Sequence, residues 1–95
     1  VHISDPLVAE TILRVVQEAM TNAAKHADAD TLSVSLHHEG SRILLDIEDD
    51  GKMRGPLREG NGIAGMRERV ASADGRLDLR RSERGGMRLQ VSLPA

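Results

Sequence analysis

The chain contains no cysteine and no Phe, Tyr or Trp among its 95 residues. Without cysteine it can form neither disulfides nor a thiolate metal site, and this composition fits a reducing compartment. Without aromatic side chains, its core must be built from Val, Ile, Leu, Met and Ala. A chain of this length has room for one domain with one modest hydrophobic core.

Charge and hydropathy exclude two further classes of protein. The 13 basic and 15 acidic residues give a net charge of −2, so direct nucleic-acid binding, which is typical of a chain with a basic stripe on one face, is not expected. No apolar run approaches the roughly 20 residues that a membrane span needs, and we expect no membrane contact. Because the first residue is Val rather than Met, we expect residues 1–95 to be one domain of a longer protein.

Two helices are predicted from local signals. Asp5 supplies an N-cap acceptor and Pro6 suits the first helical position. Apolar residues then recur at spacings of three and four, which predicts an amphipathic helix that ends near Ala27. The same spacing predicts a second helix over 63–73, and Gly75 is placed to close it in the left-handed conformation.

The remaining apolar residues alternate with polar ones, as in strands. Alternation over 31–38 and 43–48 predicts one antiparallel hairpin, and alternation over 77–79 and 87–93 predicts another. The order is therefore helix, two strands, loop, helix, two strands. This order predicts an α+β two-layer sandwich, with helices on one face of a mixed, mostly antiparallel sheet.

A stripe of four polar residues runs along the first predicted helix. Glu18, Asn22, Lys25 and His26 fall within about a third of its circumference. An Asn side-chain oxygen suits Mg²⁺, whose shell is completed by phosphates and water. A lysine and a histidine can hold phosphates, and a glutamate one turn away can orient or deprotonate a nucleophile or hold a magnesium-bound water. A solvated helix face, with contacts worth a few tenths of a kcal/mol each, explains the stripe equally well.

Two glycine-containing loops follow. Asp49 and Gly51 come directly after a predicted strand, where aspartate can accept a hydrogen bond from an exocyclic amine and glycine lets a ring approach the backbone. An ordinary strand-ending turn has the same composition. Gly60 and Gly62 come just before the second predicted helix, where exposed N–H groups bind anions. This glycine pattern is weak alone and fits neither a Rossmann motif nor a P-loop.

The order of these three motifs is more specific than any one of them. Glu-x-x-x-Asn-x-x-Lys-His, then Asp-x-Gly, then Gly-x-Gly resembles the catalytic, ATP-binding domain of sensor histidine kinases, within the GHKL ATPases of the Bergerat fold. Residues 16–27 resemble the N box of the NarX/DesK-type subfamily. Residues 62–70, which contain Met-Arg-Glu-Arg, resemble its G2 box. The resemblance covers nearly the whole chain.

The resemblance implies a role for each motif residue. Asn22 would bind Mg²⁺, Lys25 and His26 would approach the phosphates of ATP, and Glu18 would assist phosphoryl transfer. Asp49 would accept the adenine amino group. The other nucleotide contacts that the resemblance implies are Gly51, Met53, Gly60, Gly62, Ile63 and Met87.

The resemblance also implies partners. The γ-phosphate of ATP would pass to a histidine on a separate dimerisation domain and then to a response regulator, usually of the NarL/LuxR type. We expect the isolated domain to be monomeric and cytoplasmic, whether or not the parent kinase is anchored in a membrane. One alternative is a GHKL-fold interaction module, such as an anti-sigma-like regulator or a degenerate kinase without phosphotransfer. Another is a scaffold that never binds nucleotide.

Three features depart from the family pattern. Met53 stands where a second glycine is usual, and Gly55 is a substitute two residues later. The segment 52–59 is short for an ATP lid. Met87 follows Gly86, where the family often has a threonine whose hydroxyl supports the adenine side. These departures place the expected differences from the family on the adenine side and in the lid.

Overall fold

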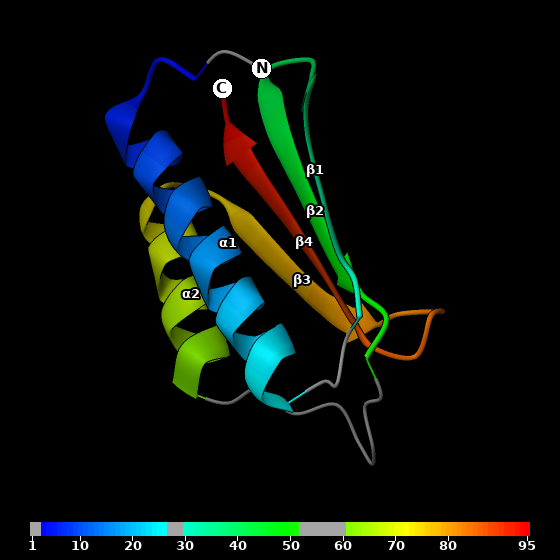
Figure 1. Ribbon diagram of the computed structural model, residues 1–95. Helices are drawn as coiled ribbons and strands as arrows, with labels where there is room; N and C mark the ends of the chain where they lie inside the picture. The colour runs from blue at the N-terminus through cyan, green and yellow to red at the C-terminus, as the bar shows by residue number, and fades with distance from the viewer. Residues whose placement is uncertain (1–2, 27–29, 52–60) are drawn as a thin grey trace.

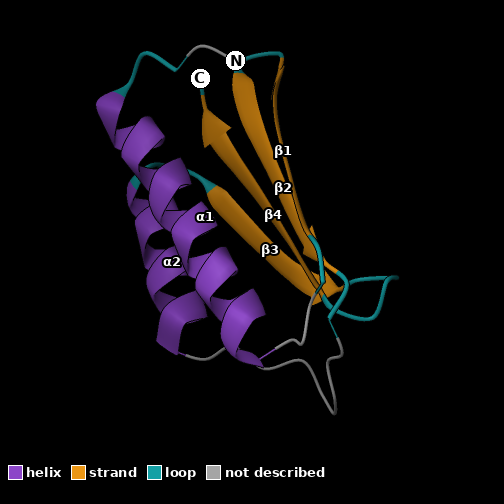
Figure 2. Cartoon of the chain, in the orientation of Figure 1, coloured by secondary structure: helices purple, strands orange, loops and turns teal. Residues whose placement is uncertain are grey.

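Two helices cover one face of a four-stranded sheet (Figures 1 and 2). The computed structural model describes residues 3–26, 30–51 and 61–95, without the side chains of Lys25, His26 and Asn61. The elements in chain order are α1 (Pro6–His26), β1 (Leu32–Glu39), β2 (Arg42–Asp49), α2 (Asn61–Ser72), β3 (Arg76–Arg81) and β4 (Met87–Pro94). The α+β two-layer sandwich predicted from the sequence is confirmed.

Helix α1 begins where the sequence predicts it. The backbone N–H of Leu7 donates to Oδ1 of Asp5 at 2.9 Å, so Asp5 is the N-cap and Pro6 is the first helical residue. The buried stripe of the helix faces the sheet and contains Val8, Ile12, Val15 and Ala19. This spacing leaves the flanks of α1 for the polar residues of the site.

The sheet has the strand order β1-β2-β4-β3, and every pairing among the described strands is antiparallel. Ile43 pairs with Leu93 and Ile47 pairs with Leu89, so the apolar side chains of both central strands share the helix-covered face. The opposite face carries polar pairs such as Asp46 and Arg88, in which Nη2 of Arg88 is 2.7 Å from Oδ2 of Asp46. Sheet pleating therefore produces one dry face and one wet face.

The core is wholly aliphatic apart from methionine, as the composition requires. Its buried residues come from both helices and from β2, β3 and β4: Val8, Ile12, Val15, Ala19, Ile43, Leu45, Ile47, Ile63, Met66, Val70, Ala73, Leu77, Leu89, Val91 and Leu93. Strand β1 contributes less, because it forms the edge of the sheet that lies away from α2. Its Val34 is 47% exposed although the alternation places it on the helix side.

The C-terminus of α2 corrects one prediction. The left-handed residue there is Asp74, with φ of 59°, whereas Gly75 does not have a positive φ. The N–H of Gly75 donates to the carbonyl of Val70, and the N–H of Asp74 donates to that of Ala71, which is the Schellman pattern shifted by one residue. Gly75 is needed for space instead, since a Cβ there would lie 2.6 Å from Leu93.

Both helices and the sheet bring their functional ends to the same side of the molecule. Figure 1 shows the C-terminal ends of α1 and β2, the N-terminal end of α2 and the β3–β4 turn together at the end opposite the first turn of α1 and the C-terminus of the chain. The polar motifs lie at these element ends. Within the described ranges, no helix is both long enough and apolar enough to cross a membrane.

Candidate functional site

The described structure includes most of the residues that the sequence nominates. Lys25 and His26 lie in the last turn of α1, but their side chains are outside the described part, as are Met53 and Gly60 entirely. The nominated residues whose surroundings can be examined are Glu18, Asn22, Asp49, Gly51, Gly62, Ile63 and Met87. They form two groups.

The first group joins α1 to the start of α2. The carboxyl group of Glu18 lies directly against Gly62, the second residue of α2. A methyl group on Gly62 would come within 2.5 Å of Oε2 and 2.8 Å of Cδ of Glu18, so the absence of a side chain creates the room for this carboxyl. A negative charge at a helix N-terminus is stabilised by the exposed N–H groups and the helix dipole.

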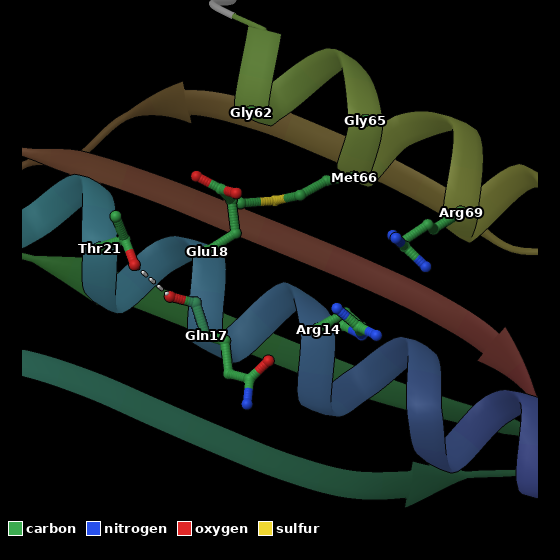
Figure 3. A pocket seen from close by; sticks show the side chains of 8 residues that line it. All are labelled: Arg14, Gln17, Glu18, Thr21, Gly62, Gly65, Met66 and Arg69. Atoms are coloured by element: carbon green, nitrogen blue, oxygen red, sulfur yellow. Dashed lines mark hydrogen bonds between the residues drawn. The ribbon is translucent and has the colours of Figure 1, made fainter.

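An open cavity of about 290 Å³ continues from Glu18 along the seam between the two helices. Figure 3 shows Arg14 from α1 and Arg69 from α2 pointing toward one another across it. Nε of Arg14 is also 3.9 Å from Oε1 of Glu10 on the same helix. The complete lining is Arg14, Gln17, Glu18, Thr21, Gly62, Gly65, Met66 and Arg69. Both arginines were missed by sequence reasoning, because ordinary helix-surface charges give no signal.

Two further nominated residues differ in their exposure. Asn22, one turn after Glu18 on α1, is half-buried and keeps an accessible side chain. Ile63 is only 4% exposed and belongs to the hydrophobic core, so its side chain anchors α2 and only its backbone can face a ligand. No three His, Cys, Asp or Glu residues cluster as a metal site in the described part of the chain.

The second group surrounds Asp49 at the end of β2. Asp49 is 4% exposed, and its Oδ1 accepts the backbone N–H of Gly51 at 2.9 Å and that of Met87 at 3.3 Å. No described residue donates to Oδ2. The backbone N–H of Met87 therefore supports the carboxyl at the position where the sequence lacks a threonine hydroxyl. One carboxyl oxygen is fixed and the other is available.

Asp50 has a different task from its neighbour. Its Oδ1 accepts the backbone N–H groups of Asp30 and Thr31, each at 2.9 Å, and so ties the chain before β1 to the end of β2. These hydrogen bonds, of which the one from Thr31 has the largest effect, lower the pKa of Asp50 below its ordinary value. Asp50 thus braces the backbone beside Asp49.

The β3–β4 turn contacts the second group closely, which sequence reasoning did not predict. Gly86 lies against the carboxyl of Asp49, and Gly85 approaches the backbone carbonyl of Gly51. The consecutive glycines in a short hairpin turn were a signal that could have indicated close backbone approach. The two groups lie at the same end of the molecule, although Asp49 does not line the cavity beside Glu18.

Comparison with known proteins places this geometry in a family. The family described as histidine kinase-, DNA gyrase B- and HSP90-like ATPase matches residues 8–95. The sensor histidine kinase YxjM of Bacillus subtilis (strain 168) is 39% identical over 94% of this chain and 22% of that protein. The sensor histidine kinase DesK of the same organism is 33% identical over 93% of this chain and 24% of that protein.

A solved structure agrees with these sequence matches. The ATP binding domain of PrrB from Mycobacterium tuberculosis has a TM-score of 0.71 and 27% identity, over 87% of this chain and 65% of that chain. The similarity to DesK confirms the predicted resemblance to the NarX/DesK-type subfamily. The chain spans less than a quarter of the length of either Bacillus kinase. On the match over residues 8–95, the chain belongs to the family of histidine kinase-, DNA gyrase B- and HSP90-like ATPases.

Proposed function

We propose that this chain is the ATP–Mg²⁺ binding catalytic domain of a two-component sensor histidine kinase, which delivers the γ-phosphate of ATP to a histidine on a separate dimerisation domain. The observation that carries the proposal is that two carboxyl groups, each placed by neighbouring backbone, lie at the same end of the fold. Glu18 lies at the N-terminus of α2, and Asp49 lies beside the β3–β4 turn. The sensor kinases among its relatives support the same function.

Asp49 would recognise the adenine base. Its Oδ1 is already occupied by two backbone N–H groups, so Oδ2 is the oxygen that would accept the 6-amino group. Gly51 is buried beside it and has no side chain to obstruct a flat ring. Burial of the aspartate excludes competing water and strengthens such a hydrogen bond.

Asn22 would hold Mg²⁺. Its half-buried side chain supplies a hard, neutral oxygen one turn from Glu18. The described residues offer no carboxylate cluster there, which fits an ion whose remaining ligands are phosphates and water rather than protein. The bound ion would neutralise charge on the transferred phosphoryl group. Lys25 and His26, in the last turn of α1, would contact the phosphates, with Gly60 and Gly62 around them.

Glu18 would position the incoming histidine. Phosphoryl transfer asks little covalent chemistry of the protein, so orientation of the nucleophile and control of its proton are the main contributions. The carboxyl of Glu18 could accept the proton of the histidine imidazole or fix its ring by a hydrogen bond. The absence of a side chain at Gly62 leaves the room that this carboxyl occupies.

The partners follow from this reaction. The phosphohistidine of the dimerisation domain would pass its phosphoryl group to a response regulator, which we propose to be of the NarL/LuxR type. The domain itself would act as a cytoplasmic monomer that docks transiently on the dimerisation domain. No contact with nucleic acid or membrane is needed for any of these steps.

A GHKL-fold interaction module is the second candidate. The short lid segment 52–59 and Met87 favour it, because both depart from the family pattern where nucleotide would be covered and bound. Mixing this domain with the dimerisation domain of its parent kinase and γ-labelled ATP separates the two functions. A kinase produces acid-labile, base-stable phosphohistidine that disappears in Asn22→Asp, whereas absence of label with intact nucleotide binding would establish the interaction module.

A further inference from the structure

We propose that the β3–β4 turn, through Gly86 and Ser82, positions the carboxyl group of Asp49 and thereby sets the preference for a 6-amino purine. This inference rests on the proposed role of Asp49 in adenine recognition. It assigns the selectivity to a turn that is 33 residues or more from Asp49 in the sequence. Neither Gly86 nor Ser82 needs to touch the nucleotide, so both are positioning residues.

Gly86 provides the space that the carboxyl occupies. A methyl group on Gly86 would lie 1.8 Å from Oδ1 and 2.5 Å from the main-chain oxygen of Asp49. Gly86 does not have a positive φ, unlike Gly85, so its requirement is room rather than backbone freedom. Any side chain at this position would push Oδ1 away from its donors, the N–H groups of Gly51 and Met87.

Ser82 holds the turn against the end of β2. It is 5% exposed, and its hydroxyl donates to Oε2 of Glu48 at 2.6 Å while accepting the N–H of Arg84 at 3.0 Å. Its own N–H donates to the carbonyl of Gly86 at 2.8 Å. Glu48 and Asp49 are adjacent and point to opposite faces of the sheet. The same turn is therefore attached to β2 from both faces.

Fixing Oδ1 gives the carboxyl a defined orientation. Oδ1 is held by two backbone donors. Oδ2 is therefore the acceptor that remains, and it can form a hydrogen bond only with a donor on the base. At position 6 a 6-amino purine presents that donor, whereas a 6-oxo purine presents an acceptor there and has its donor, N1–H, at the neighbouring ring position. Oδ2 then loses its partner at position 6. Sites built on a buried hydrogen bond reject the analogue that lacks it. A carboxyl that turns freely would lose this discrimination.

The test is calorimetric titration of this chain with ATP and with inosine triphosphate, which carries a 6-oxo group and an N1–H in place of the 6-amino group and the N1 acceptor. The wild type should bind ATP at least about tenfold more tightly, the effect of one hydrogen bond to a charged group. Gly86→Ala should weaken ATP binding by about tenfold and leave inosine triphosphate binding unchanged, so the ratio falls toward one. Ser82→Ala should lower the ratio in the same direction by a few-fold, because the turn loses only one anchor.

Gly40→Ala is the matched control. Gly40 is a turn glycine in the other hairpin, with φ of 61° and no atom within 4 Å of an added methyl group. It should lose stability through backbone strain and keep the ATP to inosine triphosphate ratio of the wild type. If Gly86→Ala fails to fold, as judged by its circular dichroism melt, the Ser82→Ala ratio decides.

The variant Asp49→Asn distinguishes failure of this inference from failure of the proposed adenine recognition by Asp49. A wild-type ratio in Asp49→Asn would show that Asp49 does not recognise the base, which overturns the proposed adenine contact itself. A collapsed ratio in Asp49→Asn, together with wild-type ratios in folded Gly86→Ala and in Ser82→Ala, would overturn only the positioning role of the turn. Collapse in Asp49→Asn and Gly86→Ala, with Gly40→Ala unchanged, supports both.

Discussion

Replacement of Gly62 by alanine tests whether the position of Glu18 matters for phosphoryl transfer. The added methyl group would start 2.5 Å from Oε2, and ordinary van der Waals contact begins near 3.4 Å, so the carboxyl must move by about 1 Å. It can do so by rotating a flexible side chain, and the fold should therefore survive. A displacement of this size in a catalytic group can reduce a rate by up to about a hundredfold.

The expected result is a selective loss. In the parent kinase, Gly62→Ala should slow phosphorylation of the histidine by about tenfold to a hundredfold at saturating ATP, a condition that separates this loss from any weaker ATP binding through the phosphate contact of Gly62. Gly65→Ala is the control, because it lies one turn further along α2 and an added methyl group there meets nothing within 4 Å. Equal phosphorylation rates in the two variants would refute the role assigned to Glu18.

Three further variants test the fold. Asp74→Gly should raise the free energy of unfolding by about 1 kcal/mol in urea, because glycine adopts the left-handed conformation at φ of 59° without steric cost; no gain, or a loss, would refute this account of the helix end. Leu93→Ala should lower the unfolding free energy by about 2–5 kcal/mol, since Leu93 is fully buried; a smaller loss would mean that the surrounding core collapses around the cavity. Because the pKa of Asp50 is lowered in the folded state, its contribution to stability is present above the unfolded value of about 4 and is lost as the pH falls through the folded value. The urea midpoints of wild type and Asp50→Asn should therefore converge as the pH falls below about 4, and a constant difference from pH 6 to pH 3 would contradict the charge-assisted bonds to Asp30 and Thr31.

The elements were predictable from the sequence because their signals are local. Asp5 and Pro6 mark the start of α1 by themselves. The alternation of apolar residues identifies the central strands β2 and β4 even when the strands that pair with them are unknown. The order of three motifs then identified the family, which the match over residues 8–95 confirms. Local propensity and motif order were sufficient for these conclusions.

The errors and omissions arose where distant segments meet. The glycine pattern favoured Gly75 as the left-handed residue, but packing against Leu93 requires a glycine there for space, and Asp74 takes the strained conformation instead. The contact between Gly86 and Asp49 depends on strand register, which a sequence does not specify. The exposure of Val34 likewise follows from the edge position of β1 rather than from its alternation.

The central claim is that this domain binds Mg²⁺–ATP through Asn22 and Asp49, and calorimetric titration of the domain with ATP in the presence and absence of Mg²⁺ tests it most directly. The account predicts saturable binding that is strengthened by Mg²⁺, with the Mg²⁺ effect lost in Asn22→Ala and ATP binding weakened by about tenfold in Asp49→Asn. The account would be contradicted if the wild type gave no heat of binding at millimolar ATP, or if both variants bound ATP with the affinity and Mg²⁺ dependence of the wild type.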